Sequence, residues 1–123
     1  MGSCLAIVSD MIFATRITGT AEKVGVKCKI IKDPGALHDA LVSENPGMVL
    51  VDMHCDGISP EEAIRTVKSH CPSARVVAFF SHVQTELMEQ AKAAGADDTW
   101  PRSVFVQRLG QLLEDVQAGN ERV

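Results

Sequence analysis

The chain alternates between short apolar runs and longer segments in which apolar residues recur at helical spacing. The apolar runs predict strands at Leu5–Val8, Val26–Ile31, Met48–Asp52, Arg75–Phe80 and Ala96–Trp100. Unbroken apolar runs suit strands that are buried on both faces, as in a parallel sheet covered by helices. The second run is mixed, with Lys27 and Lys29 predicted to face outward, which is typical of a strand at the edge of a sheet.

Local signals between these runs mark where the predicted helices begin and end. Asp33-Pro34 and Ser59-Pro60 each combine an N-cap residue with proline at the first helical position. Ser81 and Gln84 fit a capping box at the start of a later helix. Gly25 and Gly95 follow helical patterns and are expected to end them.

Strict alternation of strand and helix predicts a parallel sheet with right-handed crossovers. We expect an α/β, flavodoxin-like doubly wound fold, with a five-stranded parallel sheet of order 2-1-3-4-5 and five helices. The chain is interpreted as one domain over residues 1–123, with a core of about 4–116 and a polar tail over 117–123.

In this strand order, the carboxyl ends of several strands meet at one edge of the sheet. These ends carry Asp10, Asp52 and Phe80-Ser81, and the fifth strand adds Trp100-Pro101-Arg102. Ligand sites in such folds lie outside the carboxyl ends of the strands. Asp52, which ends the central apolar run, is therefore the predicted centre of any functional site.

Composition narrows the classes of function. Apolar residues make up 46% of the chain and charged residues 23%, which is typical of a globular domain. The net charge of −4, without a cluster of Lys or Arg, argues against nucleic-acid binding. The apolar start Cys4–Val8 is too short for a signal peptide or membrane span, so a soluble, cytoplasmic protein without a membrane partner is expected.

The four cysteines are widely spaced and contain no C-x-x-C pair. Cys4 and Cys28 fall in predicted strands, and we interpret them as small buried apolar residues rather than metal ligands. No nucleophile–base pair or glycine-rich phosphate loop is apparent, so the protein is not expected to be an enzyme.

The segments "MVLVDM" and "GADDTWPRSVF" resemble those of the receiver (CheY-like) domains of two-component response regulators. The resemblance covers roughly residues 4–116. It implies that Asp52 is the phospho-acceptor candidate and that Asp10 and Asp52 help to hold Mg²⁺. A metal ion and a lysine would then neutralise the phosphoryl group, and its charge would order a loop.

Several positions depart from the family pattern. Ser9 stands where a second acidic residue is implied, which leaves at most a weak Mg²⁺ site. Phe80 occupies the Thr/Ser position, with the phosphate-contact candidate Ser81 one residue late. Arg102 replaces the family's lysine as the other phosphate-contact candidate, and its planar group is not interchangeable with an ammonium. These departures favour a divergent, pseudo-receiver interpretation.

The resemblance also implies a switch and a surface for partner contact. Thr99 occupies the aromatic switch position, with Trp100 beside it, and Phe80 is a further switch candidate. The face of the fourth helix, fifth strand and fifth helix is expected to bind a histidine kinase, a downstream signalling protein or a second copy of the chain. Trp100 and Arg108 are its principal candidates, with Val83, Met88, Arg102 and Val104 around them.

Structural explanations compete with these roles. Asp10 and Ser81 both suit helix caps, and Trp100 suits a packing residue. Arg102 could instead form an ion pair with Asp52 or Asp10, which would close the pocket without a phosphate.

The favoured function is a stand-alone, degenerate receiver-like domain that signals through protein contact. The alternative is a working receiver that a histidine kinase phosphorylates on Asp52 with Mg²⁺. A remote alternative is cobalamin or small-ligand binding, since Asp52 to Gly57 match D-x-H-x-x-G. In cobalamin domains, however, this motif follows the first strand rather than the third.

Overall fold

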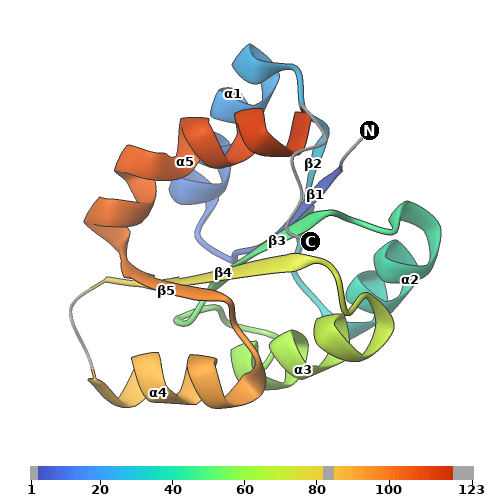
Figure 1. Cartoon of the computed structure of the whole chain (residues 1–123), viewed down its shortest axis with the longest axis vertical. Helices are drawn as coiled ribbons and strands as arrows, with labels where there is room; N and C mark the ends of the chain where they lie inside the picture. The colour runs from blue at the N-terminus through green and yellow to red at the C-terminus, as the bar shows by residue number, and fades with distance from the viewer. Residues whose placement is uncertain (1–2, 82–84, 118–123) are drawn as a thin grey trace.

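The structure, a computed structural model of the chain, describes residues 3–81 and 85–117. Strands and helices alternate along the chain as β1 (Cys4–Ile7), α1 (Met11–Val24), β2 (Cys28–Ile31), α2 (Pro34–Glu44), β3 (Met48–Asp52), α3 (Pro60–His70), β4 (Arg75–Phe80), α4 (Thr85–Ala94), β5 (Asp98–Pro101) and α5 (Arg102–Gln117). The strands form one parallel sheet of order β2-β1-β3-β4-β5, which confirms the predicted topology. Helices α1 and α5 cover one face of the sheet, and α2, α3 and α4 cover the other (Figure 1).

Alternation within each strand divides the core into two layers. In β3, Val49 and Val51 pack with the layer under α2, α3 and α4, while Met48 and Leu50 pack with the layer under α1 and α5. All four side chains are almost completely buried, as the continuous apolar run predicts. Asp52 continues this strand and is the buried charged residue of the described chain, with 2% of its surface exposed.

Helix caps follow the local signals of the sequence. Asp33 accepts a hydrogen bond from the amide of Ala36 at 2.8 Å, and Ser59 accepts one from the amide of Glu62 at 3.4 Å. Gly25 ends α1 with a φ of +91°, a left-handed conformation that glycine adopts without a Cβ penalty. These elements therefore begin and end for local reasons.

Two strands begin later than predicted, because the residues predicted to start them form hydrogen bonds with the ends of the preceding helices. The amide of Val26 donates to the carbonyl of Ala21 at 2.9 Å, and the amide of Ala96 donates to that of Ala91 at 3.0 Å. Each amide thereby completes a helix end rather than a strand ladder. As a result β2 begins at Cys28, and β5 runs over Asp98–Pro101 instead of Ala96–Trp100. The first strand likewise ends at Ile7 rather than at Val8.

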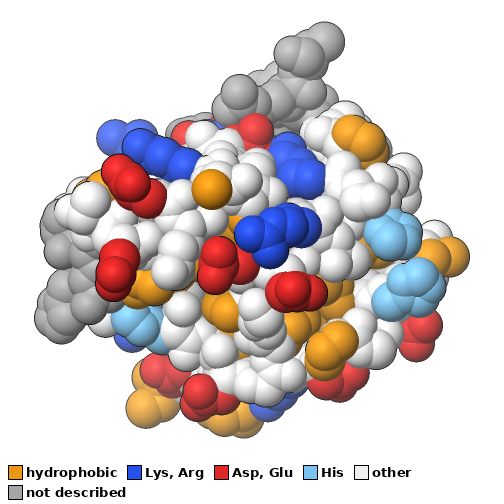
Figure 2. Space-filling model, turned by 90° about the horizontal axis from the view of Figure 1, so that it is seen from below, with side chains coloured by type: hydrophobic (Ala, Val, Ile, Leu, Met, Phe, Trp, Pro, Cys, Tyr) orange, Lys and Arg blue, Asp and Glu red, His pale blue; other side chains and the backbone are white. Residues whose placement is uncertain are grey.

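Some sequence predictions fall outside the described residues. They are the start of the fourth helix at His82, Val83 and Gln84, which includes half of the capping box with Ser81, and the polar tail beyond Gln117. Within residues 3–81 and 85–117, no helix has both the length and the apolar character to cross a bilayer. On the face formed by α2, α3 and α4, acidic and basic side chains lie interspersed among apolar ones (Figure 2).

Candidate functional site

The parallel topology brings the predicted site residues to one edge of the sheet. Asp10 follows β1, Asp52 ends β3, Ser81 follows β4 and Arg102 follows β5. The order of the strands places β1, β3 and β4 side by side in the centre. Parallel strands end at the same edge, and the loops that follow them are in direct contact at this edge. The amide of Asp56 donates to the hydroxyl of Ser9 at 3.0 Å, which joins the loop after β3 to the loop after β1.

Asp52 is held by hydrogen bonds on both of its carboxylate oxygens. Oδ1 accepts the backbone amide of His54 at 2.9 Å. Oδ2 accepts Nη2 of Arg102 at 3.3 Å, while the Asp52 side chain is only 2% exposed. A buried carboxylate needs such partners, because desolvation penalises an unpaired charge strongly. The ion pair between Arg102 and Asp52 that the sequence left open is present, and the alternative pairing of Arg102 with Asp10 is not seen.

Arg102 is positioned by an aromatic ring as well as by its charge. Its guanidinium carbon lies 4.5 Å from the centroid of Phe13, a distance at which a cation is attracted by the face of a ring. Its side chain is 30% exposed, and its buried Nε has no hydrogen-bond partner among the described residues. Arg102 is also the first residue of α5, so its backbone is fixed by that helix. The guanidinium therefore sits between Phe13 and Asp52.

Phe13 belongs to a cluster of three phenylalanines that packs beside the Arg102–Asp52 pair. Phe79 stacks on Phe105 with centroids 4.1 Å apart, and Phe13 lies 5.1 Å from Phe79. Phe79 is also the register partner of Asp52 in the neighbouring strand. This cluster was not predicted from the sequence. The alternation of β4 could have indicated it, because Phe79 shares the sheet face of Leu50 and Asp52.

Phe80, a switch candidate from the sequence, belongs to the opposite face of the sheet. It is 1% exposed and packs in the core layer under α2, α3 and α4, whereas Phe79 packs in the layer under α1 and α5. Adjacent residues of a strand point to opposite faces, so the side chain of Phe80 packs away from the face that Asp52 and Phe79 share. The ring on the Asp52 side of the sheet is that of Phe79.

Asp10 caps the first helix. Its Oδ1 accepts hydrogen bonds from the amides of Ile12 at 2.9 Å and Phe13 at 3.2 Å. The carboxylate thereby provides an acceptor for two amides of the first turn of α1 that have no partner within the helix. No group of three or more His, Cys, Asp or Glu side chains that could hold a metal ion occurs within the described ranges. Magnesium prefers several oxygen ligands. The ion is usually held by one or two carboxylates together with water molecules, and Asp10 and Asp52 would be the residues that hold it here, where both carboxylates already accept hydrogen bonds.

Replacement of Asp10 separates the capping role from a metal role. We expect Asp10→Ala to lower the free energy of unfolding by about 1 kcal/mol, because two amides of α1 lose their acceptor. Asp10→Asn, which keeps an acceptor oxygen but removes the charge, is expected to retain most of the stability. Urea denaturation followed by circular dichroism measures both. Equal losses in the two variants would contradict the capping account.

Ser81 contacts a residue that the sequence analysis did not pair with it. Its hydroxyl lies 3.2 Å from Nε2 of His54, within hydrogen-bond distance, and both side chains are exposed. Because the amide of His54 also donates to Asp52, this contact links the end of β4 to the loop that follows the carboxylate. Ser81 is thus placed at the rim of the site, where it was expected as a phosphate-contact candidate.

Trp100 and Arg108 meet on the surface of the last strand and helix. The guanidinium carbon of Arg108 lies 5.1 Å from the centroid of the Trp100 ring. A hollow of about 350 Å³ adjoins them, lined by Arg75, Trp100, Arg108, Gln111, Leu112 and Asp115. Thr99 is the register partner of Ala78, and its side chain lies on the other face of the sheet from that of Trp100. Thr99 and Trp100 are both half-buried. The two principal interface candidates are thus neighbours, whereas Thr99 is separate from them.

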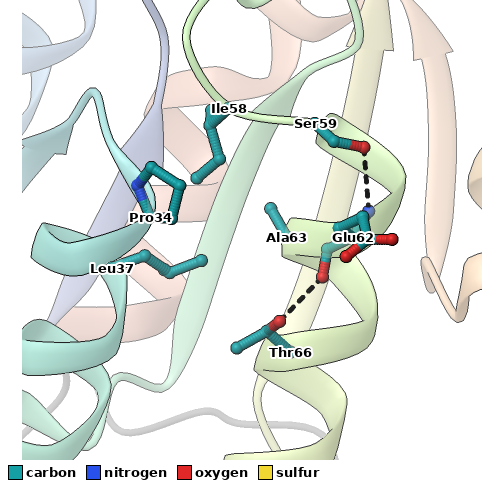
Figure 3. Close-up of a pocket in the computed structure, with 7 residues that line it drawn as sticks. All are labelled: Pro34, Leu37, Ile58, Ser59, Glu62, Ala63 and Thr66. Carbon is teal, nitrogen blue, oxygen red and sulfur yellow. Dashed lines mark hydrogen bonds between the residues drawn. The ribbon is translucent and has the colours of Figure 1, made fainter.

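A second hollow lies between α2 and α3, and Asp52 is not among the residues that line it (Figure 3). It has a volume of about 330 Å³ and is lined by Pro34, Leu37, Ile58, Ser59, Glu62, Ala63 and Thr66. Its two hydroxyl groups are already bonded to the helix backbone, since Ser59 accepts the amide of Glu62 and Thr66 donates to the carbonyl of Glu62. This hollow carries no group that the sequence marked as functional.

Comparison with known proteins places the fold. No family model matches the sequence. The chain is 35% identical over 69 residues to the transcriptional activator protein ExaE of Pseudomonas putida, which covers 54% of this chain and 32% of that protein. It superposes on NtrX from Brucella abortus with a TM-score of 0.81 at 18% identity, covering 96% of this chain and 27% of that one. It also resembles the signal receiver domain of a DNA-binding response regulator protein (merR) from Colwellia psychrerythraea 34H, with a TM-score of 0.78, 23% identity and coverage of 93% and 99%.

This chain has the fold of a response-regulator receiver domain. It spans about a third of the length of ExaE and about a quarter of NtrX, so what those whole proteins do is not transferred to it. The comparisons therefore confirm the predicted fold. In the Asp52 site of this chain, the carboxylate is contacted by Arg102.

Proposed function

We propose that this protein is a degenerate receiver-like signalling domain that acts through contact with another protein. The observation that carries the proposal is the state of Asp52. Both of its oxygens are hydrogen-bonded within the chain, and 2% of its side chain is exposed. A phosphoryl donor could reach the carboxylate only after Arg102 had left its position over Phe13.

The surroundings of Asp52 support the same proposal. Ser9 replaces the second acidic residue, and its hydroxyl accepts the amide of Asp56 instead of offering a charged oxygen to a metal. Asp10 is engaged as a helix cap. The guanidinium of Arg102 neutralises the charge of Asp52, so a bound metal cation is not needed for that purpose. These contacts support a site that works without metal and phosphate.

The proposed contact surface is the face formed by α4, β5 and α5, centred on Trp100 and Arg108. Aromatic and arginine side chains dominate binding energy at protein interfaces. Trp100 is half-buried beside the adjoining hollow, and Arg108 covers its ring. The partner would be a histidine kinase, a downstream signalling protein or a second copy of this chain. Other residues were also expected on this face. Among them, Arg102 forms an ion pair with Asp52, and Val83 lies outside the described residues.

Substitution of Trp100 tests this surface. We expect Trp100→Ala and Arg108→Ala each to weaken self-association or partner binding at least tenfold, because a buried anchor contributes roughly 2 kcal/mol or more. Sedimentation velocity over a concentration series measures self-association, and titration calorimetry measures binding to a cognate kinase. Arg16→Ala, an exposed arginine on α1, is the matched control. Unchanged binding in both interface variants would remove this surface from the proposal.

A working phospho-acceptor is the second candidate, and the position of Asp52 favours it. Asp52 ends the central strand, and a cationic side chain contacts it, as phosphoryl transfer to a carboxylate would need. This candidate requires incorporation of phosphate from acetyl phosphate in the presence of Mg²⁺. Phosphate that is incorporated in the native chain and absent from Asp52→Asn would establish this function in place of the first.

A further inference from the structure

Cys4 and Cys28 lie opposite one another at the start of two adjacent strands. They are register partners in the β1–β2 ladder, and the amide of Cys4 donates to the carbonyl of Lys27 at 3.1 Å. Neighbouring strands are separated by about 4.8 Å. Disulfide-bonded cysteines have their Cα atoms about 4.4–6.8 Å apart, so the register brings this pair within bonding range.

Both side chains lie on the same face of the sheet. Cys4 belongs to the core layer under α1 and α5, and Cys28 packs against that layer from the edge strand. Cys4 is 1% exposed, whereas Cys28 is half-buried. The expectation that both are simply buried apolar residues therefore holds for Cys4 only. A small oxidant can reach Cys28 from the sheet edge, with Cys4 directly behind it.

The two thiols differ in pKa as well as in exposure. The hydrogen bond with Cys4 lowers the pKa of Cys28 despite its partial burial. The pKa of the Cys4 thiol is raised, first by this hydrogen bond and then by burial. A thiolate is the reactive form of cysteine, and the lowered pKa favours this form in Cys28, the more accessible member of the pair.

We propose that Cys4 and Cys28 form an oxidisable dithiol, which hydrogen peroxide converts to an intramolecular disulfide. The Cys28 thiolate attacks one peroxide oxygen, the O–O bond breaks, and hydroxide leaves and takes up a proton to become water. The Cys4 sulfur then attacks the Cys28 sulfenic acid. An S–S bond forms as the S–O bond breaks, and the departing hydroxide takes the Cys4 proton. Two thiols lose two electrons, and one peroxide becomes two waters.

The other cysteines provide internal controls. Cys55 and Cys71 are buried in the core layer on the opposite face of the sheet. Burial is the main cause that raises the pKa of each of these thiols, so each is less reactive than Cys28. The Cys4–Cys28 pair also begins its strands at the edge opposite that of Asp52, so this modification does not depend on the proposed function.

The full chain treated with hydrogen peroxide provides the test. After denaturation and alkylation with iodoacetamide, we expect label on Cys55 and Cys71 only, a mass loss of about 2 Da before alkylation, and a Cys4–Cys28 cross-linked peptide. In Cys4→Ser, dimedone is expected to trap a sulfenic acid on Cys28, and Cys28→Ser should acquire no disulfide. Circular dichroism verifies that each variant is folded. Which cysteines form the disulfide is determined from the native chain, so this result does not depend on the folding of the variants. Labelling of all the cysteines after peroxide, or a disulfide between any other pair, would overturn the proposal.

Discussion

Replacing Arg102 by alanine is expected to lower the free energy of unfolding by about 2 kcal/mol. The variant leaves Asp52 buried at 2% exposure with a carboxylate oxygen that has lost its cationic partner. It also removes the guanidinium from the face of Phe13. Loss of one partner of a fully buried ion pair costs about 3–5 kcal/mol, and the 30% exposure of Arg102 reduces that figure. Urea denaturation at neutral pH measures the change.

A double-mutant cycle isolates the contact between Arg102 and Asp52. Adding Asp52→Asn to the Arg102→Ala chain removes the unpaired charge, so we expect it to recover about 1 kcal/mol of the lost stability. Arg65→Ala is the matched control, because Arg65 forms an exposed ion pair with Glu61 on α3. Exposed pairs of this kind contribute about 0.3–0.5 kcal/mol. If Arg102→Ala destabilises no more than Arg65→Ala, the ion pair does not hold the site closed.

Phe79→Ala is expected to have the largest effect on stability, a loss of about 3–5 kcal/mol. Phe79 is completely buried, stacks on Phe105 and contacts Phe13, so truncation opens a cavity beneath the site. The remaining rings cannot fill the space that an aromatic side chain leaves. Because Phe13 carries the guanidinium of Arg102, the amide signals around Asp52 are also expected to shift in a nuclear magnetic resonance spectrum.

Phe79→Leu distinguishes packing from a specific aromatic role. Leucine retains most of the apolar volume, so its expected cost is below about 1.5 kcal/mol. Thermal and chemical denaturation of both variants provide the comparison. If the leucine and alanine variants lose the same stability, the cluster owes its contribution to ring stacking rather than to filled volume. If neither loses stability, the phenylalanine cluster does not support the site.

The sequence predicts most of the fold because the relevant signals are local. Strand identity follows from continuous apolar runs such as Val49–Val51, and helix limits follow from caps such as Asp33 and Gly25. The parallel sheet follows from the strict alternation of strand and helix, and its order 2-1-3-4-5 is the one typical of a flavodoxin-like domain with five strands. The late starts of β2 and β5 escape this reasoning, since Val26 and Ala96 complete helix ends through backbone hydrogen bonds that composition does not reveal.

The site was predictable in position but not in detail. Topology alone places Asp52 and Arg102 at one edge of the sheet. The aromatic support under Arg102 depends on which strand face Phe79 occupies and on where α1 presents Phe13, and both are products of tertiary packing. The opposed cysteines likewise depend on the register of two strands, because a shift by one residue would turn Cys28 to the other face.

If Arg102 closes the Asp52 site as we propose, Asp52 does not take up a phosphoryl group. An amide nuclear magnetic resonance spectrum, recorded while millimolar Mg²⁺ and beryllofluoride are added, measures this most directly, because beryllofluoride mimics a phosphoryl group on a carboxylate. We expect the amide signals of Asp52 and His54 not to shift. Saturable shifts of these signals in the native chain that disappear in Asp52→Asn would contradict it.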